Sequence, residues 1–174
     1  LVENKGGRSQ AKMITDRVGR KIWVRGIVQG VGFRPFIYSL AARCQVTGWV
    51  RNTSSGVEME INGAPQAVSE FERAIHENPP PLAHIDSIES QPIPVNGYTS
   101  FEIQASQPQA GDFLPISPDV SICPDCQREL FDPTDRRYRY PFINCTNCGP
   151  RFSIIKDIPY DRPQTSMAGF ALCP

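Results

Sequence analysis

Runs in which apolar residues take every second position predict β-strands, because successive strand side chains face opposite sides of a sheet. In residues 21–28, Ile22, Val24 and Val28 follow this period. Further strands are predicted at residues 49–51, 57–61, 85–93 and 98–103. The Thr-Ser-Ser-Gly sequence of residues 53–56 supplies a turn, so the second and third strands form a hairpin.

Two segments between these strands have apolar residues at helical spacing instead. Residues 35–44 gather them on one stripe and begin with Pro35, which suits the first helical position. Residues 66–77 form a second amphipathic helix, which the prolines at 79–81 end. The first four strands and the two helices follow the order βαββαβ, which is that of the ferredoxin-like α+β fold, with two helices on one face of an antiparallel sheet.

Composition argues against several classes of protein. The 174 residues carry 18 basic and 18 acidic side chains, and this zero net charge argues against a general nucleic-acid binder. No apolar run approaches the ~20 residues of a membrane-spanning helix. No apolar h-region follows Leu1, so we expect no secretory signal.

Shifts in charge and proline content predict four sections along the chain. Fifteen of the 17 prolines lie beyond residue 78, and basic residues are concentrated at the start. We expect a basic polar tail, an acylphosphatase-like domain, a linker and a zinc module truncated within a second C-x-x-C motif. These sections cover residues 1–17, 18–106, 107–120 and 121–174.

The loop between the first strand and the first helix has the composition of an anion-binding site. Glycines let the backbone curl so that successive N–H groups face one concavity, next to the positive end of the helix. Arg34 can add a planar, bidentate donor to phosphate oxygens. The alternative is an ordinary glycine-rich turn beside a solvated arginine, since glycine motifs are often unspecific. The candidate loop residues are Gln29, Gly30, Val31, Gly32, Phe33 and Arg34.

At two motifs the chain resembles the acylphosphatases. These are Gly-x-Val-Gln-Gly-Val-Gly-Phe-Arg at residues 26–34 and Gly-Trp-Val-Arg-Asn at residues 48–52. The resemblance implies that Arg34 binds the phosphate of an acyl phosphate, that Asn52 orients the attacking water, and that the loop amides hold the phosphoryl oxygens. An acyl phosphate is already activated, so positioning and charge stabilisation suffice without a metal or other cofactor. Without the resemblance, Asn52 would be interpreted as a turn residue.

Four cysteines follow a zinc-binding pattern. Cys123-x-x-Cys126 and Cys145-x-x-Cys148 are separated by 18 residues, a spacing typical of structural zinc sites. Four thiolates close a tetrahedral Zn²⁺ site with no open position, so we expect a structural metal. Paired spacing also favours a reducing, cytoplasmic setting over a disulfide framework, which is the alternative. Cys44 is expected in the core.

The last two residues repeat the start of the first cysteine pair. Cys173-Pro174 matches Cys123-Pro124, which predicts that a second C-x-x-C motif begins here. Cys173 would then be a ligand of an incomplete second site. We expect the chain to be part of a longer protein.

Three longer stretches, at residues 33–36, 79–86 and 137–152, resemble the HypF family, the carbamoyltransferases of [NiFe]-hydrogenase maturation. The resemblance implies that the whole enzyme takes carbamoyl phosphate, makes carbamoyl adenylate with ATP, and passes the carbamoyl group to HypE. The part present would hydrolyse carbamoyl phosphate. ATP would be used only by the remaining domains of the parent chain, beyond Pro174.

Two other functions are open on the sequence alone. An RNA-recognition-type domain with a zinc module has the same element order, but Glu58 and Glu60 on the third strand would repel phosphates. The second alternative is a scaffold whose phosphate site has lost its catalytic activity. The presence of both Arg34 and Asn52 argues against such a loss. We expect neither a nucleic-acid partner nor a membrane partner.

Overall fold

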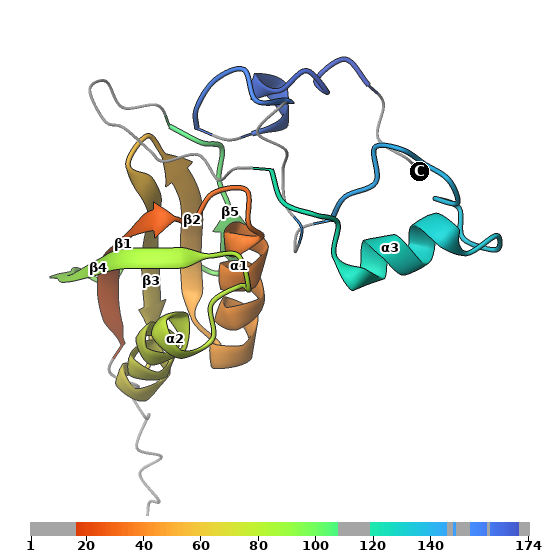
Figure 1. The fold of residues 1–174 in the computed structure, drawn as a ribbon. Coiled ribbons are helices and arrows are strands. Elements are labelled where there is room, and N and C mark those ends of the chain that lie inside the picture. Colours follow the sequence, from red (N-terminus) through yellow and green to blue (C-terminus); the bar gives the residue numbers. More distant parts are fainter. Residues whose placement is uncertain (1–16, 108–118, 146–147, 149–153, 160, 171–174) are drawn as a thin grey trace, which may run out of the picture.

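Figure 1 shows the computed structural model of the chain, which describes residues 17–107, 119–145, 148, 154–159 and 161–170. Residues 1–16 of the predicted tail, most of the predicted linker, and Cys173 lie outside the described residues. The elements are β1 (Val18–Ile27), α1 (Phe33–Cys44), β2 (Thr47–Thr53), β3 (Gly56–Gly63), α2 (Pro65–Glu77), β4 (His84–Ile93), β5 (Phe101–Ile103), α3 (Pro124–Phe131) and the 3₁₀ helix η2 (Arg162–Gln164).

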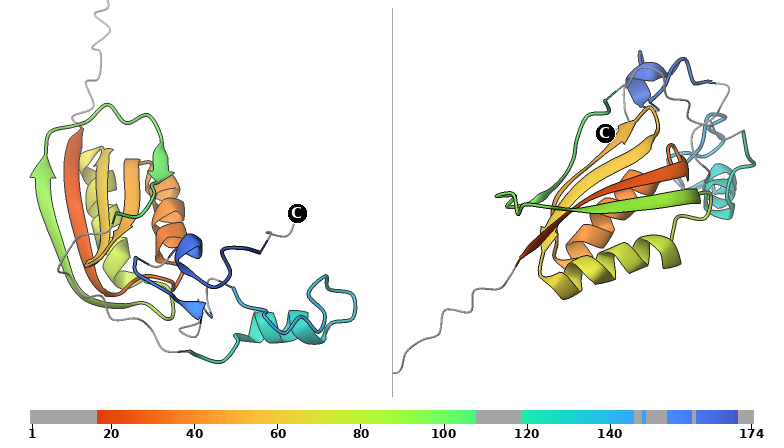
Figure 2. Two further views of the ribbon diagram at one scale, coloured as in Figure 1. Left: turned by 90° about the horizontal axis from the view of Figure 1, so that it is seen from above. Right: turned by 90° about the vertical axis from the view of Figure 1, so that its left-hand side faces the viewer.

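One five-stranded sheet forms the frame of the first domain, in the order β4-β1-β3-β2-β5. Neighbouring strands are antiparallel except β2 and β5, which are parallel. Helices α1 and α2 lie together on one face of this sheet, as both views of Figure 2 show. This arrangement confirms the predicted ferredoxin-like α+β fold.

The core lies between the sheet and the two helices because each element turns its apolar stripe inward. Its largest fully buried side chains come from the sheet, from both helices and from the loop before α1. Cys44 is part of this core, as its place on the helical stripe predicts. The main members are Ile22, Val24, Val31, Phe33, Ile37, Leu40, Val50, Met59, Ile61, Phe71 and Ile75.

The start of α1 and the extent of the last strand differ from the sequence prediction. Helix α1 begins at Phe33, so Pro35 is its third residue rather than its first. Gly32, at φ 77°, caps the helix in the left-handed conformation and lets it start two residues early. The missing N–H of Pro35 still costs no helical bond, because the first four N–H groups have no partner within a helix. The strand predicted at residues 98–103 is reduced to Phe101–Ile103.

The helix-free face of the sheet is held by ion pairs. Glu58 is 4% exposed and binds Lys21 at 2.8 Å and Arg51 at 2.6 Å. Burial alone would raise the pKa of its carboxyl, but hydrogen bonds from Lys21 and Arg51 outweigh burial and lower it. Tyr98 donates to Glu60 at 2.8 Å and accepts from Trp49 at 3.0 Å. The acidic residues of β3 are therefore part of a closed network.

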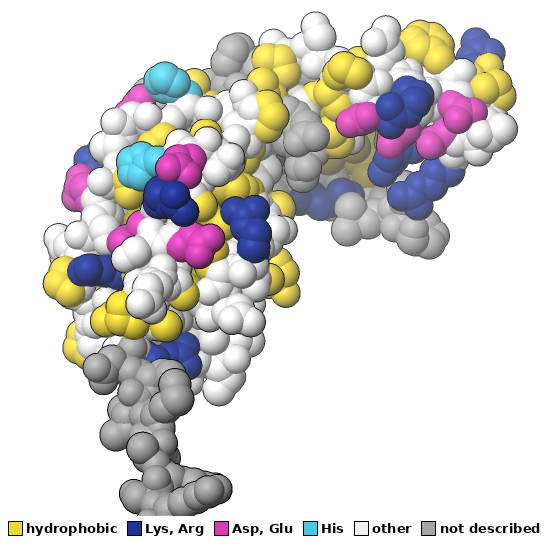
Figure 3. All heavy atoms as spheres, turned by 90° about the horizontal axis from the view of Figure 1, so that it is seen from below, with side chains coloured by type: hydrophobic (Ala, Val, Ile, Leu, Met, Phe, Trp, Pro, Cys, Tyr) yellow, Lys and Arg dark blue, Asp and Glu magenta, His cyan; other side chains and the backbone are white. Residues whose placement is uncertain are grey.

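The cysteine module has a small core of its own around α3. Cys123 caps this helix, with Pro124 in its first turn, and Cys126 lies within it. Cys126, Ile143 and Cys148 are buried together. On the face of the molecule drawn in Figure 3, basic and acidic side chains are intermingled rather than gathered by sign. Among the described residues, no helix is both long and apolar enough to span a membrane.

Candidate functional site

The loop between β1 and α1 has the backbone geometry of an anion cradle. Gly30 and Gly32 both adopt left-handed conformations, at φ 75° and 77°. The N–H of Phe36 donates to the carbonyl of Gly32 at 3.0 Å, which closes the first turn of α1 directly after the loop. That turn contains no acidic residue, so the positive helix end is not neutralised from within. A phosphate matches this combination of turned backbone and helix N-terminus.

The side chain of Gln29 fastens this loop to the β2–β3 hairpin. Its Nε2 donates to the carbonyl of Thr53 at 2.6 Å and to that of Gly56 at 2.7 Å. Gln29 is 7% exposed, so both bonds are shielded from water. The side-chain amide N–H groups of Gln29 therefore hold the loop in place. The backbone N–H of Gln29 is the group that could bind an anion.

Asn52 lies at the end of β2, beside the loop that Gln29 anchors. It is 1% exposed and pairs with Val57 in the ladder to β3, so it is a strand residue rather than a turn residue. It shares a face of β2 with the buried Val50, because side chains two positions apart point the same way. Its carbonyl accepts from the N–H of Gln107 at 2.9 Å.

Arg34 is the second residue of α1, and its side chain is 21% exposed. Its Nη2 lies 2.5 Å from Oδ1 of Asp161, and its Nη1 lies 3.5 Å from Oγ of Ser106. The hydroxyl of Ser106 donates to the other carboxylate oxygen of Asp161. The side chain of Arg34 therefore contacts Ser106, and the backbone carbonyl of Asn52 contacts the adjacent Gln107, so the same short segment passes both predicted site residues.

Ser106 and Asp161 were not identified from the sequence. Ser106 is the last residue before the predicted linker, and Asp161 follows the cysteine pairs without any motif around it. They lie 72 and 127 residues from Arg34 along the chain. No local pattern could have identified them, because only the tertiary fold brings them to Arg34.

The four paired cysteines converge as their spacing predicts. The Sγ atoms of Cys123, Cys126, Cys145 and Cys148 all lie within 4.8 Å of one another. Three of the separations are 3.5, 3.9 and 3.6 Å, for the pairs 123–145, 145–148 and 126–148. A tetrahedron with Zn–S bonds of about 2.3 Å has edges of about 3.8 Å. The donor set and its size therefore fit a closed, structural zinc site.

The protonation of these thiols differs with their surroundings. Burial raises the pKa of the Cys126 thiol, and the neighbouring cysteines raise it further. Burial alone would also raise that of Cys148, but backbone N–H groups at Cys123 and Cys145 outweigh it and lower the pKa to about 7. One thiol of the cluster thus gives up its proton near neutral pH, which favours metal binding.

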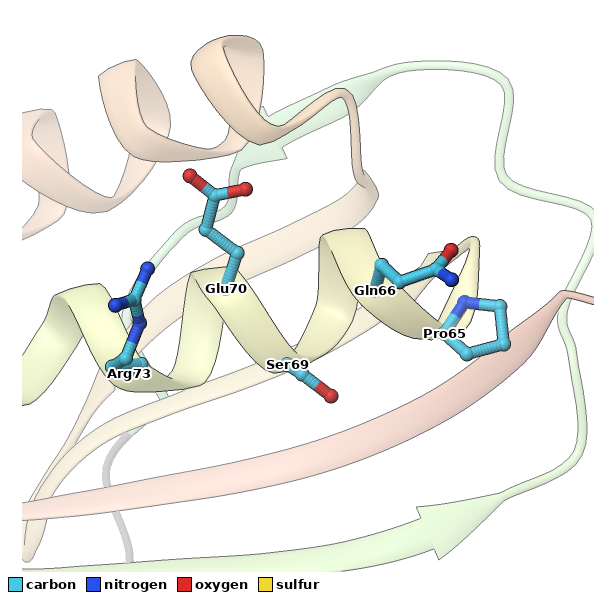
Figure 4. Close-up of a pocket in the computed structure, with 5 residues that line it drawn as sticks. All are labelled: Pro65, Gln66, Ser69, Glu70 and Arg73. Atoms are coloured by element: carbon cyan, nitrogen blue, oxygen red, sulfur yellow. The ribbon is translucent and has the colours of Figure 1, made fainter.

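Two hollows on the described surface lie away from these residues. One, of about 420 Å³, is lined by α2 alone, at Pro65, Gln66, Ser69, Glu70 and Arg73 (Figure 4). Another, of about 270 Å³, lies between α1 and β5 and is lined by Tyr38, Phe101 and their neighbours. Neither contains Arg34 or Asn52, so we locate the candidate site from its chemistry.

Known proteins resemble both parts of the chain. The acylphosphatase family model matches residues 20–103, and the HypF finger model matches residues 122–155. An acylphosphatase of Synechococcus sp. is 39% identical over 92 residues, which are 52% of this chain and 97% of that protein. The chain belongs to the acylphosphatase family. Its acylphosphatase domain is followed by a match to the HypF finger, and the two parts together are similar to part of the HypF carbamoyltransferases.

The HypF relatives match across both parts. Carbamoyltransferase HypF2 of Cupriavidus necator is 46% identical over 157 residues, which cover 88% of this chain and 19% of that protein. A crystal structure of full-length HypF in the phosphate- and nucleotide-bound form has a TM-score of 0.86 and 53% identity, over 91% of this chain and 21% of that one. The chain thus spans about a fifth of the length of these relatives.

Proposed function

We propose that this chain hydrolyses the acyl phosphate carbamoyl phosphate, as the first step of carbamoyl transfer. The observation that supports this most is the placement of Arg34 and Asn52 against neighbouring residues of one segment, beside the glycine loop. The HypF relatives, which are named carbamoyltransferases, supply the acyl group of the proposal.

The chemistry needs only binding, orientation and charge stabilisation. Arg34 and the backbone amides of residues 29–34 hold the phosphoryl oxygens, and Asn52 orients a water molecule toward phosphorus. Water forms the new P–O bond as the bond from phosphorus to the carbamate oxygen breaks. Neither Arg34 nor Asn52 can accept a proton at neutral pH, so the proton of the water passes to a phosphate oxygen. The products are phosphate and carbamate.

The cysteine cluster would hold its Zn²⁺ for structure rather than chemistry. Cys123, Cys126, Cys145 and Cys148 supply four thiolates, which fill a tetrahedral site and leave no position for substrate. The metal would hold α3 and the second cysteine pair together, where the buried apolar core is small.

The later steps belong to partners outside this chain. The carbamate would be adenylated with ATP by the remaining domains of the parent chain, and the carbamoyl group passed to HypE. A cytoplasmic setting, predicted from the paired cysteines, is part of this proposal. The domain limits at residues 18–106 and 121–174, and the second metal site at Cys173, also stay predictions.

An RNA-binding role has less support. Base stacking needs exposed aromatic rings on the sheet. Trp49 is 7% exposed, with Arg51 over its ring at 4.5 Å, and the ring of Trp23 lies 5.2 Å from Lys21 Nζ. Glu58 and Glu60 also bring negative charge to this face.

Two variants separate the proposed roles. Arg34→Ala should lose most of its affinity for inorganic phosphate, since it removes the charged donor. Asn52→Ala should lower kcat about 100-fold and leave phosphate affinity within about threefold, since the role proposed for Asn52 is to orient the water and not to bind phosphate. Asn78→Ala, at an exposed position after α2, is the control. Phosphate binding by calorimetry and phosphate release should be measured together, with thermal unfolding as the check on folding. An Asn52→Ala variant that is folded and fully active would reject the assigned role.

A further inference from the structure

The arginine of the proposed site is held by a residue from beyond the cysteine pairs. Asp161 precedes η2, and its Oδ1 lies 2.5 Å from Nη2 of Arg34. Figures 1 and 2 show the segment around η2 at the end of the sheet where β1 runs into the loop before α1. Two parts of the chain that are separated by both cysteine pairs thus meet at one guanidinium.

Asp161 is itself fixed to the frame of the sheet. Ser106 donates to its Oδ2, so both carboxylate oxygens are engaged. Ser106 belongs to a segment that runs along β2, where the N–H of Gln104 donates to Val50 and that of Gln107 donates to Asn52, both at 2.9 Å. A carboxylate tied to the sheet in this way can restrict the position of Arg34.

We infer that Asp161 is a positioning residue for Arg34, so that the segment after the cysteine pairs completes the phosphate site. This inference rests on the proposed function. An arginine side chain has high rotamer entropy, and fixing its planar fork in advance spares that entropy when phosphate binds. A guanidinium carries five N–H donors, so a bond to Asp161 does not by itself exhaust its capacity.

The carboxylate has a second effect of opposite sign. Its negative charge lies at the arginine and by itself weakens the attraction for a phosphate. Removal of that charge would therefore tighten phosphate binding if Asp161 were only a competitor for Arg34. Removal would weaken phosphate binding if positioning dominates. The anchoring by Ser106 favours positioning, because a tethered carboxylate holds the fork in one place.

Asp161→Asn tests the inference, because it keeps the shape of the side chain and removes its charge. We expect its affinity for inorganic phosphate to fall about tenfold and its KM for carbamoyl phosphate to rise by a similar factor. Its kcat and its thermal unfolding temperature should stay close to those of the wild type. Asp157→Asn is the matched control, since Asp157 is an exposed acid of the same segment and bonds only its neighbour Ile158 in the described contacts.

The Asp161→Asn substitution should also be made in an Arg34→Lys protein, which shows whether Asp161 acts through Arg34. Arg34→Lys keeps a positive charge without the planar fork, so Asp161→Asn should change its KM less than twofold. An equal loss in both backgrounds would overturn the positioning role, and so would tighter phosphate binding by Asp161→Asn. If Arg34→Ala itself leaves phosphate release intact, the proposed function fails. If the Arg34 variants lose activity but Asp161→Asn has the phosphate affinity and KM of the Asp157→Asn control, the positioning role of Asp161 fails and the proposed function stands.

Discussion

Two hydrogen bonds from the side chain of Gln29 hold the loop before α1 against the β2–β3 hairpin, and substitution of Gln29 tests their contribution. Gln29→Met keeps most of the side-chain volume but removes both N–H donors. The carbonyls of Thr53 and Gly56 then each lose a short bond, of 2.6 and 2.7 Å, in a buried setting. At about 1 kcal/mol for each bond, the free energy of unfolding should fall by about 2 kcal/mol.

Gln29→Glu should cost more. It places carboxylate oxygens where the two carbonyls now receive N–H groups, and a buried charge without a donor is more costly than a missing bond. We expect a loss of at least ~3 kcal/mol. The control is Gln91→Met, because Gln91 is an exposed glutamine on β4 of the same sheet.

Urea unfolding followed by tryptophan fluorescence measures these differences, since Trp23 and Trp49 both lie in the sheet. The same variants should bind inorganic phosphate about tenfold more weakly under native conditions, because the loop is no longer held against the hairpin. A Gln29→Met protein with the stability and phosphate affinity of the Gln91→Met control would refute this reasoning. Lower stability with unchanged phosphate affinity would show that the loop keeps its shape without Gln29.

Two further predictions concern the cysteine cluster and the helix-free face. Protein purified without chelators should contain about one Zn²⁺ per chain by atomic absorption. Cys126→Ser should lose most of this metal, whereas Cys44→Ala should keep it, because Cys44 lies in the first core. Glu58→Gln should lower the free energy of unfolding by about 2 kcal/mol at pH 7. Because the folded pKa of Glu58 lies below its unfolded value, its stabilisation is present above an unfolded pKa of ~4.3 and is lost as pH falls through the folded pKa. The gap between wild type and Glu58→Gln should therefore close in acid; a gap that stays constant from pH 7 to pH 3 would contradict the ion-pair account.

Elements with local periodicity were predictable from the sequence, and elements defined by tertiary contact were not. The alternation of Ile22 and Val24 marks β1, since burial of one sheet face imposes that period. Helix α3 has only eight residues inside a proline-rich section, too few for a clear period. Strand β5 has only three residues beside β2, so most of the strand predicted at residues 98–103 did not form.

Some residues of the candidate site could likewise be identified from local sequence motifs, and others only from tertiary contacts. The glycines, Arg34 and the four paired cysteines follow spacings that the sequence alone could single out, and Asn52 was identified through its resemblance to the acylphosphatase motif. The side-chain bonds of Gln29 to the hairpin, and those of Ser106 and Asp161 at Arg34, join residues between 24 and 127 positions apart. Such contacts depend on strand order and loop path, which the local pattern does not specify.

The most direct test of the account is phosphate release from carbamoyl phosphate by the zinc-loaded chain, with Arg34→Ala and Arg43→Ala measured beside it. Arg43 is an exposed arginine at the far end of the same helix. We predict release by the wild type and by Arg43→Ala, and a loss of about 100-fold or more in kcat/KM for Arg34→Ala. Equal release by all three proteins, or none from a folded wild type, would contradict it.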